Sequence, residues 1–401
     1  MIEVFRVALM LGLTSFGGPI AHLGYFHREY VERRGWLSES TYLDFVALSQ
    51  FLPGPASSQV GIGIGLLRAG YRGAVAAWLG FTLPSAVALT GFAFIASRID
   101  VSSAGWLHGL QLAAVAVVAT AVLTMWRSLA PDRPRRTIAL PAAAAILLLP
   151  AATFQVLVIA VGGVVGWRLL SDLPVPDAAD SHSPVERRVG LVALAVFVVL
   201  LVGLPVAAGV GGPRGPGGAG GSGAVAVVDA FYRAGSLVFG GGHVVLPLLH
   251  ESVVAPAWVT ESQFLAGYGA AQAVPGPLFT FAAFLGASLN IEPNGVAGAL
   301  IALLAIFLPS FLLIVGTVPF WDRLRRWPAF RGALAGINAA VIGLLLAALY
   351  DPVWTTAVGT SLDVAIVIVA FGALAVWQAP PWAVVLGSAL AAQAVRAVGW
   401  A

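Results

Sequence analysis

Four short breaks rich in glycine and proline interrupt long apolar stretches of this sequence. They are Phe16-Gly17-Gly18-Pro19, Pro53-Gly54-Pro55, Gly240-Gly241-Gly242 and Pro275-Gly276-Pro277. A helix that begins after such a break has unpaired backbone N–H groups and a positive dipole end, and both attract anions. Glycine lets the backbone approach a ligand closely, and proline in a first helical turn leaves no donor unused. The breaks therefore indicate a binding site for a small anion.

Polar side chains gather around these breaks in otherwise apolar surroundings, where such residues are usually functional. They are Thr14, Ser15, His22, Gln50, Ser57, Ser58 and Gln59 in the first half of the chain, and Arg233, His243, Gln272 and Thr280 in the second. Arg233 lies about one and a half helical turns before Gly240, so its guanidinium could give bidentate hydrogen bonds to a tetrahedral dianion. Alternatively, Arg233 forms a structural ion pair with Asp229, four residues earlier.

The other candidates also have structural interpretations. The glycines of the breaks can serve close helix packing, and the Ser and Thr hydroxyls can bond back to their own helices. His22 and His243 can be packing residues, proton-linked groups or donors to a substrate. Arg28, Arg33, Arg34 and the arginines from 323 to 331 are expected to act only as topology determinants.

The composition is that of an integral membrane protein. Of 401 residues, 59% are hydrophobic and only 10% are charged, whereas soluble chains carry roughly a quarter charged residues. All 21 basic residues are arginines, and they lie in short loops between apolar runs. This placement is typical of topology signals in a multi-pass plasma-membrane protein and argues against nucleic-acid binding. With no cysteine and no signal-peptide pattern, we expect no disulfide and no thiolate metal site, and no cofactor is expected either.

An internal repeat relates the two halves of the chain. "SFGGPIAHL" (15–23) matches "VFGGGHVVL" (238–246), "GWLSESTYLDFVALSQFLPGP" (35–55) matches "AWVTESQFLAGYGAAQAVPGP" (257–277), and "GFTLPS" (80–85) matches "AIFLPS" (305–310). In this alignment Gln50 corresponds to Gln272, and Glu39 corresponds to Glu261. We expect a first repeat over residues 1–170, a linker with one crossing helix and a glycine-rich loop over 171–224, and a second repeat over 225–401.

Arginine placement and segment length predict how these segments enter the membrane. Only about 33 residues separate Arg34 from Arg68, whereas two full crossings need about 40, so this segment is expected to be a re-entrant hairpin with its tip at Pro53-Gly54-Pro55. Residues 2–34 form a similar hairpin. The corresponding flanks in the second half carry no arginine, so the two halves are expected to have inverted topology. The predicted fold is all-α, with broken helical hairpins and crossing helices in each half.

With these motifs in hand, the sequence resembles the chromate ion transporter family in its two-domain form. The resemblance covers roughly residues 3–128 and 225–346, through "GLTSFGGPIAHLG", "AAWLGFTLPS" and "FGGGHVVLPLL". It implies chromate efflux and resistance, with sulfate as an isosteric dianion. In the family pattern, a basic residue commonly stands six positions before the Phe of each FGG break. Arg233 occupies that position, but Met10 stands at its counterpart, so we expect the second half to provide most of the charge recognition.

Several functions remain open from the residues alone. The first is a secondary carrier exporting chromate by alternating access, and the second is a carrier that imports sulfate or another small oxyanion. An anion channel is a third. No HExxH, GxSxG or nucleotide-binding loop is present, which argues against an enzyme or an ATP-driven pump. The sequence does not decide whether the chain forms a homo-oligomer in the lipid bilayer.

Single cysteines test the predicted topology directly, because the chain contains none of its own. Cysteines replacing Arg34 and Arg68 are expected to react with an impermeant thiol reagent from one side of the membrane, and those replacing Ala255 and Asn290 from the other. Labelling of all four positions from the same side would contradict the inverted arrangement.

Overall fold

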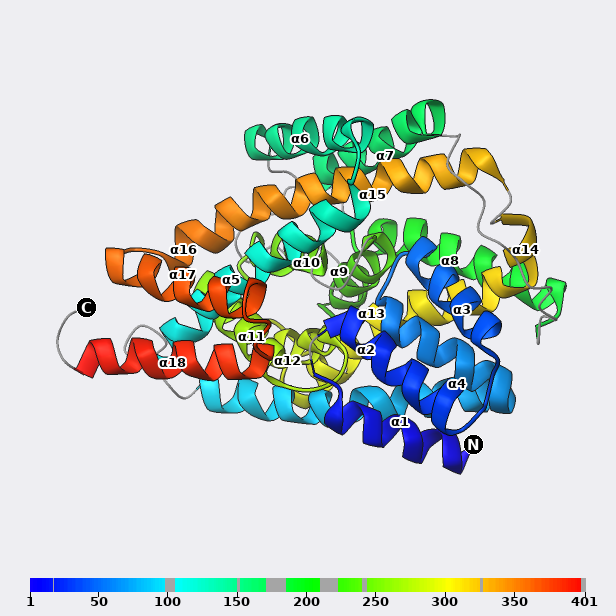
Figure 1. The fold of residues 1–401 in the computed structure, drawn as a ribbon, viewed down its shortest axis with the longest axis horizontal. Helices are drawn as coiled ribbons and strands as arrows, with labels where there is room; N and C mark the ends of the chain where they lie inside the picture. The colour runs from blue at the N-terminus through cyan, green and yellow to red at the C-terminus, as the bar shows by residue number, and fades with distance from the viewer. Residues whose placement is uncertain are drawn as a thin grey trace.

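The protein is an all-helical assembly with its longest helices roughly parallel to one another (Figure 1). This computed structural model describes residues 1–16, 18–97, 105–149, 152–170, 185–209, 223–239, 244–324 and 327–397. No β-strand occurs among these residues. The predicted all-α architecture is confirmed.

The helices fall into two sets separated by α8 (Arg187–Ala207). The first set is α1 (Ile2–Thr14), α2 (Gly18–Phe26) with a π-helical extension (His27–Arg33), α3 (Glu39–Phe51), α4 (Ala56–Ala96), α5 (Gly105–Leu129), α6 (Arg133–Leu148) and α7 (Ala152–Leu169). The second set is α9 (Gly223–Leu237), α10 (Val245–Val253), α11 (Glu261–Ala273), a 3₁₀ turn (Leu278–Thr280) leading into α12 (Phe281–Ala287), α13 (Gly295–Thr317), α14 (Trp321–Leu324), α15 (Pro328–Ala348), a π turn (Leu349–Trp354) with α16 (Thr355–Ala357), α17 (Ser361–Ala375) and α18 (Pro381–Ala397). The order of elements repeats, as two homologous halves require.

Local sequence signals explain where the broken hairpins start and stop. The Ser38 side chain caps α3 by accepting a hydrogen bond from the Thr41 N–H, and the matching Thr260 caps α11 through a reciprocal capping box with Gln263. Both helices then end just before a Pro-Gly-Pro break, because proline cannot continue the helical hydrogen bonding. These matched caps and stops produce the predicted short arms.

Helix α4 contains two helices in one continuous stretch. Its backbone leaves helical geometry at Ala69 and Gly70, and Gly70 has a φ of +63°. The part before this kink returns from the Pro53-Gly54-Pro55 break, and the part after it forms a long apolar helix. The structure thus contains the predicted hairpin over residues 35–68, followed by a crossing segment.

The two halves run in opposite directions. Helix α1 begins near the arginine-bearing loop, where Glu3 pairs with Arg34 at 3.4 Å. Helix α9 begins beside the arginine-free loop, where Gly223 lies against the Glu292 carbonyl. Together with α8, which is one of five helices in the described part of the chain that are long and apolar enough to cross a membrane, this arrangement gives the inverted repeat.

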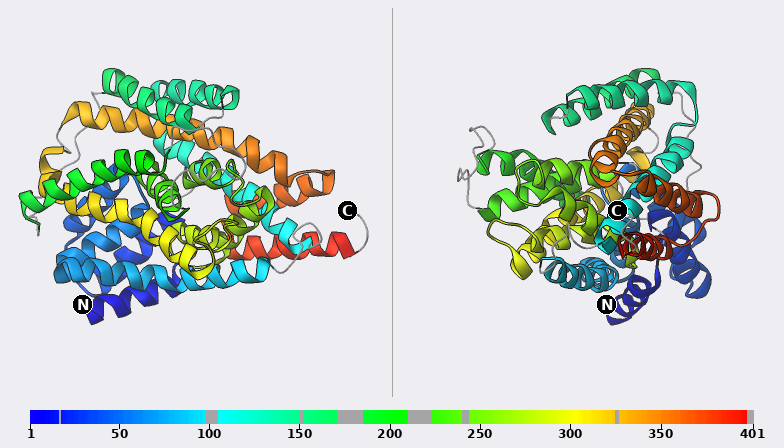
Figure 2. Two further views of the ribbon diagram at one scale, coloured as in Figure 1. Left: turned by 180° about the vertical axis from the view of Figure 1, so that it is seen from behind. Right: turned by 90° about the vertical axis from the view of Figure 1, so that its left-hand side faces the viewer.

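The terminal hairpin of each half packs on the opposite half. Helices α6 and α7 lie along α15, whereas α17 and α18 lie against α5 (Figure 2). Small residues allow this close approach: Gly162 and Gly166 meet Gly336, and Gly109 meets the backbone of Ala389. The two halves therefore interlock rather than pack as separate units.

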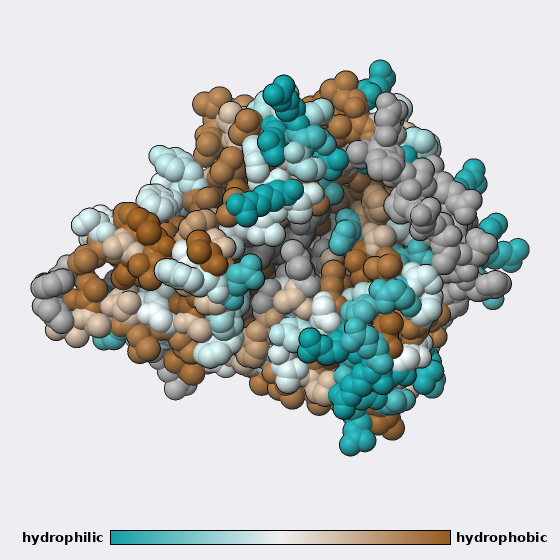
Figure 3. Space-filling view, in the orientation of Figure 1, coloured by the Kyte–Doolittle hydropathy of each residue, from teal (hydrophilic) through white to brown (hydrophobic). Residues whose placement is uncertain are grey.

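Much of the outer surface is apolar, as a lipid-facing surface requires. Large hydrophobic side chains are exposed along the crossing helices, including Val199 on α8 and Leu300 on α13. Figure 3 shows such side chains spread over the face in view, with hydrophilic groups gathered at a few places. The chain is a multi-pass membrane protein.

Candidate functional site

Two hydrogen bonds cross between the halves at the helix breaks. The Gly54 N–H donates to the Val238 carbonyl at 2.7 Å, and the Gly276 N–H donates to the Ser15 carbonyl at 2.9 Å. In the repeat, Gly54 corresponds to Gly276 and Ser15 to Val238. The contacts therefore have the same pseudo-twofold relation as the halves, and each Pro-Gly-Pro break meets the other half just before its glycine-rich break.

Glycine is required at the centre of each Pro-Gly-Pro break. Gly54 and Gly276 have φ values of +124° and +100°, which L side chains rarely adopt. A Cβ on Gly54 would lie 2.8 Å from the Ser310 hydroxyl oxygen, and one on Gly276 would lie 2.8 Å from that of Ser85. Each break is thus in contact with a serine from a crossing helix of the opposite half.

Buried polar atoms without hydrogen-bond partners gather where these breaks meet. They are Ser15 Oγ, His22 Nε2, Ser58 Oγ, Gln59 Oε1, Thr82 Oγ1 and Ser310 Oγ, and each of these side chains is at most 1% exposed. Leaving such a group unpaired costs about 1–3 kcal/mol. A concentration of these groups at one place is expected where a polar ligand completes the hydrogen bonding.

The neighbouring polar groups hold these side chains in place. His22 Nδ1 lies 3.3 Å from Ser57 Oγ, and its ring meets the Phe81 ring edge to face at 5.3 Å between centroids. The Gln59 amide donates to the Pro53 carbonyl at 2.6 Å. The first turn of α4 thereby connects the break at residue 53 to α2.

The two halves contribute unequally to this cluster. His22, Ser57 and Gln59 in the first half correspond to Val245, Phe279 and Phe281 in the second. Thr280 keeps a hydroxyl, which donates to the Pro277 carbonyl at 2.7 Å. The hydrogen-bonding groups of the first half are thus replaced by apolar side chains at these three positions of the second half, whereas the expectation that the second half provides most of the charge recognition stays a prediction.

Arg233 is held in an ion pair. Its Nε and Nη2 lie 2.9 Å and 2.7 Å from the two carboxylate oxygens of Asp229, and the Asp229 side chain is 3% exposed. The structural alternative considered for Arg233 is therefore present, and the carboxylate neutralises its charge.

The structure places the remaining predicted residues in different surroundings. Gln50 is exposed, whereas Gln272 is half-buried with an unpaired Nε2. Pro53, Pro55 and Pro277 are buried beside the crossing, and Gly18, Pro275 and Gly276 are half-buried. Pro19 lies in the first turn of α2. Gly17 and Gly240, Gly241, Gly242 and His243 lie outside the described residues.

Access to the breaks differs between the halves. Helix α11 packs along α5, where Gly269 lies against the Leu110 carbonyl. The corresponding α3 has no equally extended contact with α15 in the described part of the chain. Figure 3 shows a hollow in the middle of this face, between α15 and the α2–α3 hairpin of Figure 1. The α3 arm therefore packs less extensively against the opposite half than the α11 arm does.

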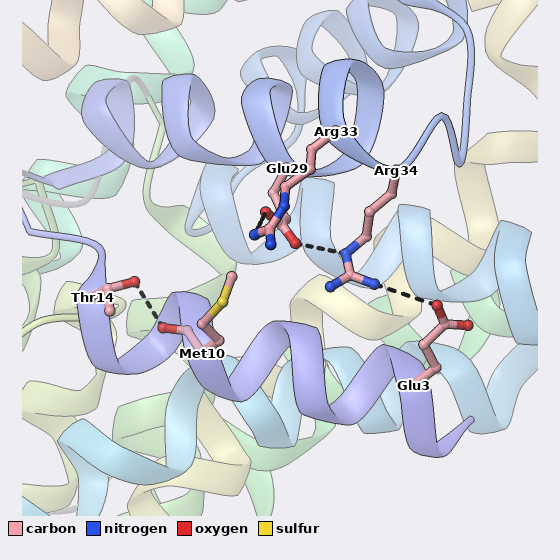
Figure 4. Close-up of polar contacts among 6 residues, drawn as sticks. All are labelled: Glu3, Met10, Thr14, Glu29, Arg33 and Arg34. Carbon is pink, nitrogen blue, oxygen red and sulfur yellow. Dashed lines mark hydrogen bonds and ion pairs between the residues drawn. The ribbon is translucent and has the colours of Figure 1, made fainter.

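The arginine-bearing end of the α1 hairpin is tied together by ion pairs (Figure 4). Glu29 accepts from Arg34 at 2.6 Å and from Arg33 at 3.1 Å. Burial raises the pKa of Glu29, but the hydrogen bonds from both arginines lower it by more, so the carboxylate stays charged. A pocket of about 350 Å³ lies beside this network, lined by Ile2, Glu3, Arg6, Val7, Met10 and Arg34. Arg34 thus connects the start of α1 to the end of the hairpin through Glu3 and Glu29, and its expected role in topology stays a prediction.

A matched His–Glu pair braces each hairpin at its outer end. His27 Nε2 lies 2.6 Å from Glu39, and its counterpart His250 lies 2.8 Å from Glu261. The hydrogen bond to Glu39 raises the pKa of His27. These pairs belong to opposite halves of the inverted repeat and lie away from the breaks, so the polar residues predicted around the breaks do not include them. The described residues contain no group of three or more side chains suited to a metal ion.

Sequence reasoning also missed Thr82, Ser85 and Ser310, which lie on the crossing helices rather than next to a break. The shared "LPS" of "GFTLPS" and "AIFLPS" contains both serines. A serine repeated at the same place in two apolar helices was the sequence signal that could have identified Ser85 and Ser310.

Replacing Gly276 by Ala tests the crossing. A φ of +100° and the Ser85 hydroxyl both oppose a Cβ, so Gly276→Ala is expected to destabilise the protein by about 1–3 kcal/mol. Gly91→Ala is the control, because no atom lies within 4 Å of a Cβ there. Thermal unfolding in detergent measures both. Equal unfolding midpoints for the two variants would contradict the crossing geometry.

A paired substitution tests Arg233. Arg233→Gln alone leaves the Asp229 carboxylate buried without its cation and is expected to cost about 3–5 kcal/mol. The double variant Asp229→Asn/Arg233→Gln removes both charges, so we expect it to recover stability and anion flux in vesicles. A stable double variant without flux would instead assign Arg233 to substrate binding.

Comparisons with known proteins agree with this architecture. The profile of the chromate transporter family matches residues 2–167 and 225–393. A chromate transport protein of Pseudomonas aeruginosa is 28% identical over 88% of this chain and 82% of its own length. One from Cupriavidus metallidurans is 28% identical over 85% of this chain and 79% of its own. No solved structure gives a significant match. With both halves matched, the chain belongs to the chromate transporter family, a family of membrane transporters and not of enzymes.

Proposed function

We propose that this protein is a secondary carrier that exports chromate across the plasma membrane. The observation that carries the proposal is the group of unpaired, buried polar side chains at the crossing of the two halves, led by Ser15, His22 and Ser58. Relatives of similar length from two bacteria are chromate transport proteins by name.

The substrate in this proposal is bound by neutral donors. Hydroxyl groups, the His22 ring and the N–H groups at the start of α2 and α4 surround the crossing, and a hydrogen bond to a charged partner contributes about 1.5–3 kcal/mol. A fully ionised tetrahedral oxyanion has only acceptor oxygens, so it suits such a set of donors. Sulfate shares this chemistry, and import of sulfate or another oxyanion is the second candidate.

The crossing favours a carrier over a channel. A channel needs a continuous pore, whereas here hydrogen bonds from Gly54 and Gly276 connect the two halves directly at the breaks. The unequal packing of α3 and α11 supports alternating access, in which the α3 side is open while the α11 side is closed. A gradient would then supply the energy, because the sequence contains no nucleotide-binding loop.

Uptake of labelled chromate into inside-out vesicles tests the proposed function. We expect saturable accumulation that sulfate inhibits, that chloride does not inhibit, and that disappears when the driving gradient is collapsed. Non-saturable flux that follows only the substrate gradient would indicate a channel. Flux of another oxyanion without chromate flux would identify that oxyanion, and not chromate, as the substrate.

A further inference from the structure

Arg331 is the only arginine among the described residues that is buried, with 6% of its surface exposed. It lies in the first turn of α15, close to the exposed Arg323. Its Nε and Nη1 atoms have no hydrogen-bond partner, and no ion pair to it occurs among the side chains that the structure describes. A topology determinant is expected to keep its charge exposed at the membrane surface. Arg323 is exposed, whereas Arg331 is not.

The surroundings make this position costly for an unpaired cation. A buried charge without a partner destabilises the folded protein strongly. The N-terminus of α15 adds a partial positive charge of its own, which disfavours a cation there and favours an anion. Both effects are relieved if an anion binds beside Arg331.

The position of Arg331 connects it to the crossing. Its neighbour Phe330 meets Phe51 at 6.3 Å between ring centroids, and Phe51 is the last residue of α3 before the Pro53-Gly54-Pro55 break. The Trp321 ring meets the same Phe51 at 5.4 Å. The indole Nε1 of Trp321 is also buried without a partner. One unpaired N–H donor thus belongs to a ring in contact with Phe51, and others belong to Arg331, the residue that follows Phe330 in the chain.

We infer that Arg331, with the Trp321 indole, forms an oxyanion-binding site at the end of α3, next to the Pro53-Gly54-Pro55 break. This inference rests on the proposed function and deepens it. The neutral donors at the crossing provide hydrogen bonds, and Arg331 provides the positive charge that Arg233 does not, because Arg233 is paired with Asp229. The ligand is a tetrahedral dianion, which a guanidinium binds through two parallel hydrogen bonds.

Thermal unfolding of the purified full-length protein in detergent tests this site, with sodium sulfate titrated against sodium chloride at matched ionic strength. Sulfate that binds the folded state raises the unfolding midpoint of the wild-type protein. We expect Arg331→Gln to weaken the apparent sulfate affinity at least tenfold. Its midpoint without sulfate should be no lower than that of the wild-type protein, because the substitution removes an unpaired buried charge. Arg323→Gln, the exposed control in the same segment, should keep the wild-type response.

Each other outcome has a defined meaning. An unchanged sulfate response in Arg331→Gln would overturn the inference while leaving the proposed function intact. A lower midpoint without sulfate, at unchanged sulfate affinity, would make Arg331 structural and overturn it as well. A wild-type protein that neither sulfate nor chromate stabilises would contradict the proposed function itself. A response to short-chain phosphatidylglycerol but not to sulfate would assign the site to a lipid phosphate and overturn it for a free oxyanion.

Arg331→Met provides a second charge-free variant of similar length, should Arg331→Gln fail to fold. It is expected to show the same loss of sulfate response. If Arg331→Met retains the full response, Arg331 does not bind the anion.

Discussion

The two hydrogen bonds that cross between the halves, from Gly54 to Val238 and from Gly276 to Ser15, are the constraint on which the site depends. Backbone that leaves helical geometry inside a membrane protein must find partners within the protein. Here each break finds one in the opposite half, which fixes the relative position of the two halves. The same crossing brings Ser310 to Gly54 and Ser85 to Gly276.

In the proposed site, the neutral hydrogen-bond donors and the positive charge come from different helices. The crossing offers hydroxyls, an imidazole and helix N-termini, all without formal charge. Arg233, the permanently charged candidate near the breaks, is neutralised by Asp229. If neutral donors alone bound the dianion, no opposite charge would compensate the free energy of removing the dianion from water. In the proposed site, Arg331 on α15 offsets this cost. The start of α15, in the second half, lies beside the end of α3, in the first half.

The hairpins could be predicted from sequence because their signals are local. Caps at Ser38 and Thr260 and prolines at the breaks set where each arm starts and stops, and the repeat doubles every such signal. The exchange of terminal hairpins could not be predicted, since the small-residue contact at Gly109 would fit either half. The burial of Arg331 could not be predicted either. Its position near the start of an apolar helix is also where topology arginines occur, and only tertiary packing distinguishes the two.

The most direct test of the central claim is the position of the bound substrate. A crystal structure of the protein with chromate, with chromium located by its anomalous scattering, would give that position. The account predicts an anomalous peak between the crossed breaks, within hydrogen-bonding reach of Ser15 and Ser58, with a second peak at Arg331 if the entry site is also occupied. A chromium peak beside Arg233, or only at sites outside the crossing, would contradict it.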